Sequence, residues 1–116
     1  MKFHFYETSG GEDLIHQELL LIKDERLQKQ IVNKLSFYAQ KTFQQFLAGK
    51  DLEKIKRTSL WELKFRTSPP FRTLCFLISL SDMLILHLLK KDYDGPIRNQ
   101  EIQIALSRLK DYNLRH

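Results

Sequence analysis

The chain has little of the chemistry on which several classes of protein depend. It contains one cysteine, three prolines and four glycines in 116 residues. A single cysteine cannot form an internal disulfide, and no spacing of cysteine and histidine resembles a zinc site. No glycine-rich phosphate loop occurs, and no nucleophile motif surrounds the serines. These absences make a nucleotide-binding enzyme or a serine hydrolase a poor fit, and we expect no metal and no cofactor.

No apolar run is long enough to cross a membrane. The longest candidate, from Thr73 to Leu89, is interrupted by two serines, an aspartate and a histidine, whereas a spanning helix needs about 20 mainly apolar residues. The first residues also lack the apolar core and the cleavage pattern of a secretory signal. We therefore expect no membrane partner and a cytoplasmic location. We also expect Cys75 to be a buried, inert thiol.

What the chain does contain indicates one globular domain, residues 1–116. Hydrophobic residues make up 42% and charged residues 28%, and a chain of this length can form a core without disulfides or metal. Hydrophobic periodicity and turn residues predict the elements. In chain order these are a strand over 2–6, helices over 12–22 and 24–50, a three-strand antiparallel meander over 59–65, 71–78 and 83–91, and a helix after the turn at Gly95 and Pro96. This order predicts an α+β fold in which the helices pack on one face of the sheet.

The net charge of +5 is unevenly distributed. Residues 1–25 carry two lysines and six acidic residues, whereas residues 54–72 carry six basic residues and Glu62 as their only acid. Concentrated positive charge favours a phosphate backbone or an acidic partner. The alternative is a solvated basic surface without a ligand.

Four motifs in the second half of the chain occur in an order that resembles a known family. They are LWELKF, FRTLCFLI, LILHLLKK and EIQIALSRLKDY, and they span roughly residues 59–112. Together they resemble RelE/HigB-type toxins, specifically the phage-derived HigB-like branch. The resemblance implies a RelE-like fold, a compact sheet with N-terminal helices against one face and the RNA site on the other.

The resemblance also implies an activity. Proteins of this family are mRNA interferases, endoribonucleases that are often ribosome-dependent, and an antitoxin from the same operon holds them inactive. The implied partners are therefore mRNA, the ribosome and a cognate helix-turn-helix antitoxin, in a type II toxin–antitoxin system. Lys64 stands where the family usually has arginine, and acid–base candidates are few. The alternative is a non-catalytic RelE-fold module of phage origin that binds RNA or a protein.

Metal-free RNA cleavage requires three functions from side chains. The 2′-hydroxyl must lose a proton, the phosphorane charge must be stabilised, and the leaving 5′-oxygen must be protonated. Arginine suits the second function, because its fixed charge and planar donors match phosphate oxygens. Arg72 is the strongest candidate, since it begins an apolar strand and matches the aromatic-Arg position of the family. The alternative is a salt bridge to Glu62 or to an acid of the final helix.

The other predicted catalytic residues lie close to strand ends. Lys64 is on the polar face of the first strand of the meander. Lys90 and Lys91 end the last strand, where alternation points them to opposite faces, so only one of them can face the site. Tyr93 follows in the turn. The alternatives for it are stacking on a base, proton transfer, and plain packing of its ring within the turn.

Four more residues are predicted to contact RNA. Arg66 lies on the same polar strand face as the predicted catalytic lysine, and Lys54, Lys56 and Arg57 form a basic segment before the sheet that is suited to steering toward RNA. His87 lies in an apolar strand, where a hydrogen-bonded core histidine competes with a catalytic one. No residues are assigned to a metal.

Overall fold

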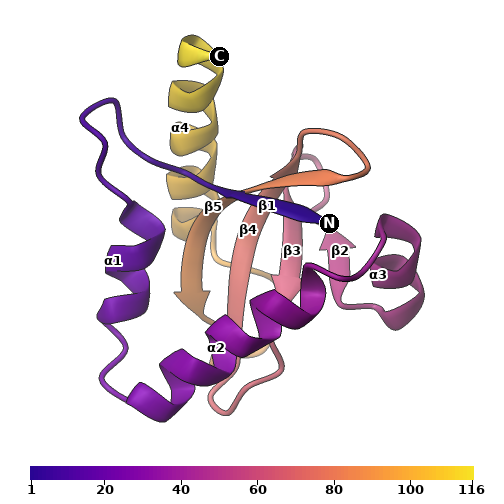
Figure 1. Cartoon of the computed structure of the whole chain (residues 1–116). Helices are drawn as coiled ribbons and strands as arrows, with labels where there is room; N and C mark the ends of the chain where they lie inside the picture. Colours follow the sequence, from indigo (N-terminus) through magenta and orange to yellow (C-terminus); the bar gives the residue numbers. More distant parts are fainter.

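A mixed five-stranded sheet forms the centre of the computed structural model, which describes all residues from Met1 to His116 (Figure 1). The strand order is β1-β5-β4-β3-β2; β1 runs parallel to β5, and the other neighbours are antiparallel. The strands are β1 (Lys2–Phe5), β2 (Leu52–Lys54), β3 (Trp61–Lys64), β4 (Phe71–Leu77) and β5 (Asp82–Lys90). The predicted α+β class and the meander of β3, β4 and β5 are confirmed. β2 was not predicted, because three residues are too few to show an alternating pattern.

Four helices accompany the sheet, one more than the sequence predicts. They are α1 (Leu14–Leu20), α2 (Glu25–Tyr38), α3 (Phe43–Gly49) and α4 (Asn99–Arg115). The predicted helix over 24–50 is interrupted, because Thr42 begins a new one: its hydroxyl accepts a hydrogen bond from the Gln45 N–H, and the Gln45 side chain accepts one from the Thr42 N–H. This capping box satisfies amide donors at the start of α3. None of the four helices is both long and apolar enough to span a membrane.

The helices cover both faces of the sheet, so the prediction that they pack on one face is wrong (Figure 1). Ile31 of α2 belongs to a core cluster with Cys75 of β4, whereas Ala105 of α4 belongs to a second cluster with Leu74. Successive residues of β4 thus enter different cores. The nearly continuous apolar sequence of the central strands is typical of a sheet that is buried on both faces.

Tyr38, at the end of α2, joins the helix layer to the end of β3. Its ring is fully buried, with its centroid 5.2 Å from that of Phe46 and 6.1 Å from that of Phe65. Its hydroxyl donates a hydrogen bond to the Lys64 carbonyl at 2.7 Å. This contact positions the backbone of a residue whose side chain extends to the opposite face of the sheet.

We expect Tyr38→Phe to lower the free energy of unfolding by ~1 kcal/mol, because the Lys64 carbonyl loses a buried donor while the ring still packs. Urea denaturation monitored by circular dichroism measures the change. Tyr112→Phe is the matched control, since this ring is only half-buried and its hydroxyl makes no hydrogen bond within the chain. An equal destabilisation in the two variants would show that the Tyr38 hydrogen bond contributes nothing specific.

Candidate functional site

A groove of about 620 Å³ lies between β2, β3, the start of β4 and the segment that precedes α4. It is on the α4 face of the sheet, because the intervening residue Leu63 points into the α2 core. Five cationic side chains and two carboxylates line it, so its formal charge is +3. We call it the basic groove; its lining residues are Glu53, Lys54, Ile55, Lys56, Glu62, Lys64, Arg72, Lys91, Gly95, Pro96, Ile97 and Ile102.

Two ion pairs form the floor of the basic groove. Glu53 and Glu62 are opposite each other on β2 and β3, and Lys64 and Arg72 are opposite each other on β3 and β4. Like charges in such positions repel each other. Here Arg72 Nε donates to Glu62 at 2.9 Å, and Lys64 Nζ donates to Glu53 at 2.8 Å, so each carboxylate neutralises one cation. The salt bridge from Arg72 to Glu62, one of the two alternatives for this arginine, is present.

The two pairs differ in burial. The Arg72 and Glu62 side chains are only 16% and 13% exposed, whereas Glu53 is 64% exposed. The hydrogen bond from Lys64 lowers the pKa of Glu53, and the charge of Lys64 adds to this effect. Both carboxylates face the groove beside a cation, so the groove holds a proton acceptor next to a positive charge at two positions. Glu62 was not predicted as a functional residue, although its alternation with Leu63 placed it on the same strand face as Lys64.

The other three groove cations are less constrained. Lys54 Nζ donates to the Thr58 carbonyl, and Lys91 Nζ donates to the Tyr93 carbonyl at 3.0 Å. Lys56 is exposed and is the only one of the five groove cations that makes no hydrogen bond or ion pair. It is therefore available to an anionic ligand without disruption of an existing interaction.

Lys90 and Lys91 face different clefts, as strand alternation predicts. Lys91 lines the basic groove, whereas Lys90 lines a separate cleft with His87 and pairs with Asp92 at 3.3 Å. Tyr93 does not line the basic groove. Its hydroxyl accepts the backbone N–H of Arg98 at 3.2 Å, and the Arg98 guanidinium carbon lies 4.0 Å from the ring centroid. The structure thus places both Lys90 and Tyr93 outside the basic groove.

Arg66 and Arg57 also lie outside the basic groove. Arg66 follows β3, where its Nε donates to Asp51 at 3.0 Å and a second guanidinium nitrogen donates to the Lys50 carbonyl. Arg57 is exposed in the turn between β2 and β3, with a positive φ of 64°. Five of the nine predicted site residues therefore line the basic groove, namely Lys54, Lys56, Lys64, Arg72 and Lys91.

His87 is a hydrogen-bonded core histidine. Its Nδ1 lies 2.6 Å from a carboxylate oxygen of Glu18 in α1, and its Nε2 contacts Glu101 in α4. Glu18 also accepts from Arg108 at 3.1 Å and from the Leu88 N–H at 3.1 Å. We call these residues the His87 cluster. No sequence pattern indicates it, because its acidic members come from two helices on either side of the sheet edge.

Burial and hydrogen bonding act in opposite directions on the pKa values of the His87 cluster. Burial disfavours the charged forms, but the hydrogen bonds and charges of Glu18 and Glu101 outweigh it and raise the pKa of His87. Likewise, the hydrogen bonds from His87, Arg108 and the Leu88 N–H outweigh burial and lower the pKa of Glu18. The cluster is therefore charged and internally neutralised at moderately acidic pH.

The basic groove and the His87 cluster are two polar sites that draw on distant parts of the chain. No protein-family model matches the chain, and no curated protein matches it. The chemistry of both sites is therefore argued from their geometry.

The His87 cluster predicts how stability depends on pH. A raised folded-state pKa gives stabilisation that is complete below the ordinary histidine value of 6.5 and is lost as pH rises through the folded pKa. The lowered pKa of Glu18 gives stabilisation that is present above its ordinary value of 4.5 and is lost as pH falls. We therefore expect His87→Gln to cost roughly 2 kcal/mol of unfolding free energy near pH 6 and progressively less above it.

Urea denaturation at several pH values between 5 and 9 measures this difference. His16→Gln is the matched control, because His16 is exposed on α1 and its side chain has no partner. A His87→Gln destabilisation that stayed constant across the range would mean that the pKa of His87 is the same in the folded and unfolded states, which would contradict the raised folded-state value.

Proposed function

We propose that the basic groove binds single-stranded RNA and that the chain is an mRNA interferase toxin of the RelE/HigB type. One observation carries the proposal: the groove brings together five cations from β2, β3, β4 and the residues that follow β2 and β5, namely Lys54, Lys56, Lys64, Arg72 and Lys91. Such a concentration of cations around a concave surface is what a phosphate backbone selects. The groove lies on the face opposite α2, as the family resemblance implies for an RNA site.

The proposed reaction uses the Arg72–Glu62 pair at the phosphate. The Arg72 guanidinium binds the non-bridging oxygens of the scissile phosphate and stabilises their charge in the phosphorane. The Glu62 carboxylate, 2.9 Å from Arg72, accepts the proton of the neighbouring 2′-hydroxyl as its oxygen attacks phosphorus. The bond from phosphorus to the 5′-oxygen then breaks, and an ammonium group of Lys56 or Lys91 protonates that oxygen. The products are a 2′,3′-cyclic phosphate and a 5′-hydroxyl.

The positive charge of the basic groove also indicates which partners it would bind. Messenger RNA in the ribosome would occupy the groove during cleavage, and ribosomal RNA would meet the exposed Lys56 and Arg57 first. The cognate helix-turn-helix antitoxin would inhibit by covering the groove with an acidic segment, since a formal charge of +3 favours such a partner.

A non-catalytic binding module is the second candidate, and the ion pairs favour it. Arg72 and Lys64 are each already paired with a carboxylate, so the groove holds fewer free cations than its composition indicates. In this case the groove binds RNA or an acidic protein and no bond is broken. Cleavage and binding are therefore measured separately.

Cleavage is tested by mapping RNA ends in cells after brief induction of the wild-type chain, Arg72→Gln and Arg66→Gln. We expect new 5′-hydroxyl ends within translated frames for the wild type and at least ~100-fold fewer for Arg72→Gln, because the phosphorane loses its cation. Arg66→Gln removes the same charge outside the groove and should behave as the wild type. Absence of new ends from soluble, folded wild-type protein would leave only the binding module.

Binding is tested by the salt dependence of affinity for a 2′-O-methyl oligonucleotide, which cannot be cleaved by this route. Removal of one cation that binds a phosphate should reduce the slope of log K against log salt by about 0.7. We expect this reduction for Lys56→Gln and Lys91→Gln, which line the groove, and no change for Lys90→Gln, which lines another cleft. Equal slopes for all three variants would place the bound strand elsewhere.

A further inference from the structure

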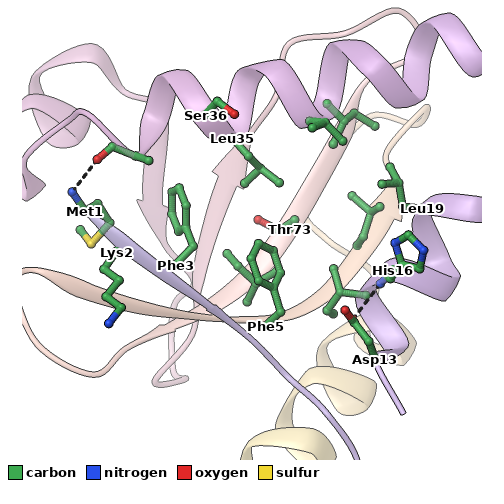
Figure 2. A pocket seen from close by; sticks show the side chains of 16 residues that line it. Met1, Lys2, Phe3, Phe5, Asp13, His16, Leu19, Leu35, Ser36 and Thr73 are labelled. Atoms are coloured by element: carbon green, nitrogen blue, oxygen red, sulfur yellow. Dashed lines mark hydrogen bonds between the residues drawn. The ribbon is translucent and has the colours of Figure 1, made fainter. Parts of the chain in front are cut away.

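An apolar cleft of about 540 Å³ lies on the α2 face of the sheet, between β1, α1 and α2. Figure 2 shows Phe3 and Phe5 of β1 beside this space, with Leu35 of α2 above them and Thr73 of β4 at its floor. Most of its lining residues are hydrophobic, yet Phe5 and Val32 remain 41% and 45% exposed. Contiguous exposed apolar surface of this kind marks an interaction site.

The adjoining strand has unpaired backbone groups. β1 is an edge strand, and the Lys2 N–H bonds to the Ser81 carbonyl at 2.8 Å, so alternate residues of β1 face β5. The N–H and C=O groups of Phe3 and Phe5 therefore point away from β5, and they make no hydrogen bond within the chain. An open strand edge is a template for pairing with another strand.

The two ends of this edge carry opposite charges. Lys2 is exposed at the start of β1, whereas Glu7 and Asp13 form a backbone bridge just beyond its end. A bound segment that places an acidic residue beside Lys2 and a basic residue beside Glu7 complements both ends. The edge thus combines a short row of unpaired backbone groups, opposite charges at its two ends and an apolar cleft along one side.

We propose that β1 and the adjoining cleft bind an extended segment of a partner protein, which joins the sheet as a strand beside β1. The backbone of the segment pairs with Phe3 and Phe5, its alternate apolar side chains enter the cleft, and its charged ends meet Lys2 and Glu7. A helix or a small apolar ligand fills the cleft but leaves the strand edge unpaired, whereas an added strand satisfies both features. This surface lies on the opposite face from the basic groove, so the proposal does not rest on RNA binding or cleavage.

The test uses a synthetic peptide, acetyl-Arg-Thr-Val-Thr-Val-Thr-Glu-amide, and hydrogen exchange measured by NMR on the full chain. We expect the peptide to slow exchange of the Phe3 and Phe5 amides by at least about 10-fold, because new strand hydrogen bonds protect them. The His4 amide faces β5 and serves as an internal control that should not change. The same peptide N-methylated at alternate residues retains its side chains but loses its pairing edge, and we expect it to give no protection.

Variants test the cleft independently of the strand edge. Val32→Lys places a charge in the cleft and should weaken peptide binding at least ~10-fold, whereas Leu114→Lys, at a site 79% exposed on α4, should not change it. Equal binding of the N-methylated peptide, or no protection of Phe3 and Phe5, would overturn the proposal. Protection that appears without peptide and rises with protein concentration, together with a dimer mass in sedimentation equilibrium, would overturn it in favour of a second copy of this chain.

Discussion

Burial of β4 and β5 on both faces decides where this chain can hold charge. Leu74, Cys75, Leu84 and Ile85 are each no more than 1% exposed, and they alternate between two separate cores. An ionised side chain at such a position loses its hydration and is tolerated only with a partner. The basic residues therefore gather at the ends of the central strands and on the shorter strands beside them. The basic groove forms where these positions meet the segment that leads into α4.

His87 is the exception within β5, and it lies next to a shift in the register between β4 and β5. Leu74 pairs with His87 and Cys75 pairs with Ile85, so Leu86 has no partner across the ladder. β1 pairs with β5 only as far as Ile85, which leaves the rest of that edge to α1. Glu18 fills the vacant edge position, because its carboxylate accepts the Leu88 N–H as well as a bond from the imidazole. The hydrogen bonds of Glu18 to His87 and to the Leu88 N–H thus hold α1 against the part of the β5 edge that β1 does not cover.

The sequence predicted local features of the fold and of the candidate site, and the rest depended on contacts between distant segments. Alternation in LWELKF placed Trp61 and Leu63 on one face and Glu62 and Lys64 on the other, as observed. Alternation could not say which of Lys90 and Lys91 joins Arg72, because the choice depends on the register between β4 and β5. It also could not show that α4 covers a different face from α2. That assignment depends on tertiary packing and leaves no periodic signal in either helix.

The geometry of Arg72 reconciles its ion pair with its proposed role. A guanidinium has five N–H donors. Glu62 occupies the Nε donor and the Phe71 carbonyl occupies one Nη1 donor, at 2.9 and 3.1 Å, which leaves three donors. The Arg72 side chain is only 16% exposed. Its ion pair with Glu62 therefore fixes the orientation of the guanidinium without occupying all of its N–H donors. In the proposed reaction, the phosphate would bind the remaining donors without displacing Glu62, and its arrival would place a 2′-hydroxyl next to a carboxylate that is already held in position.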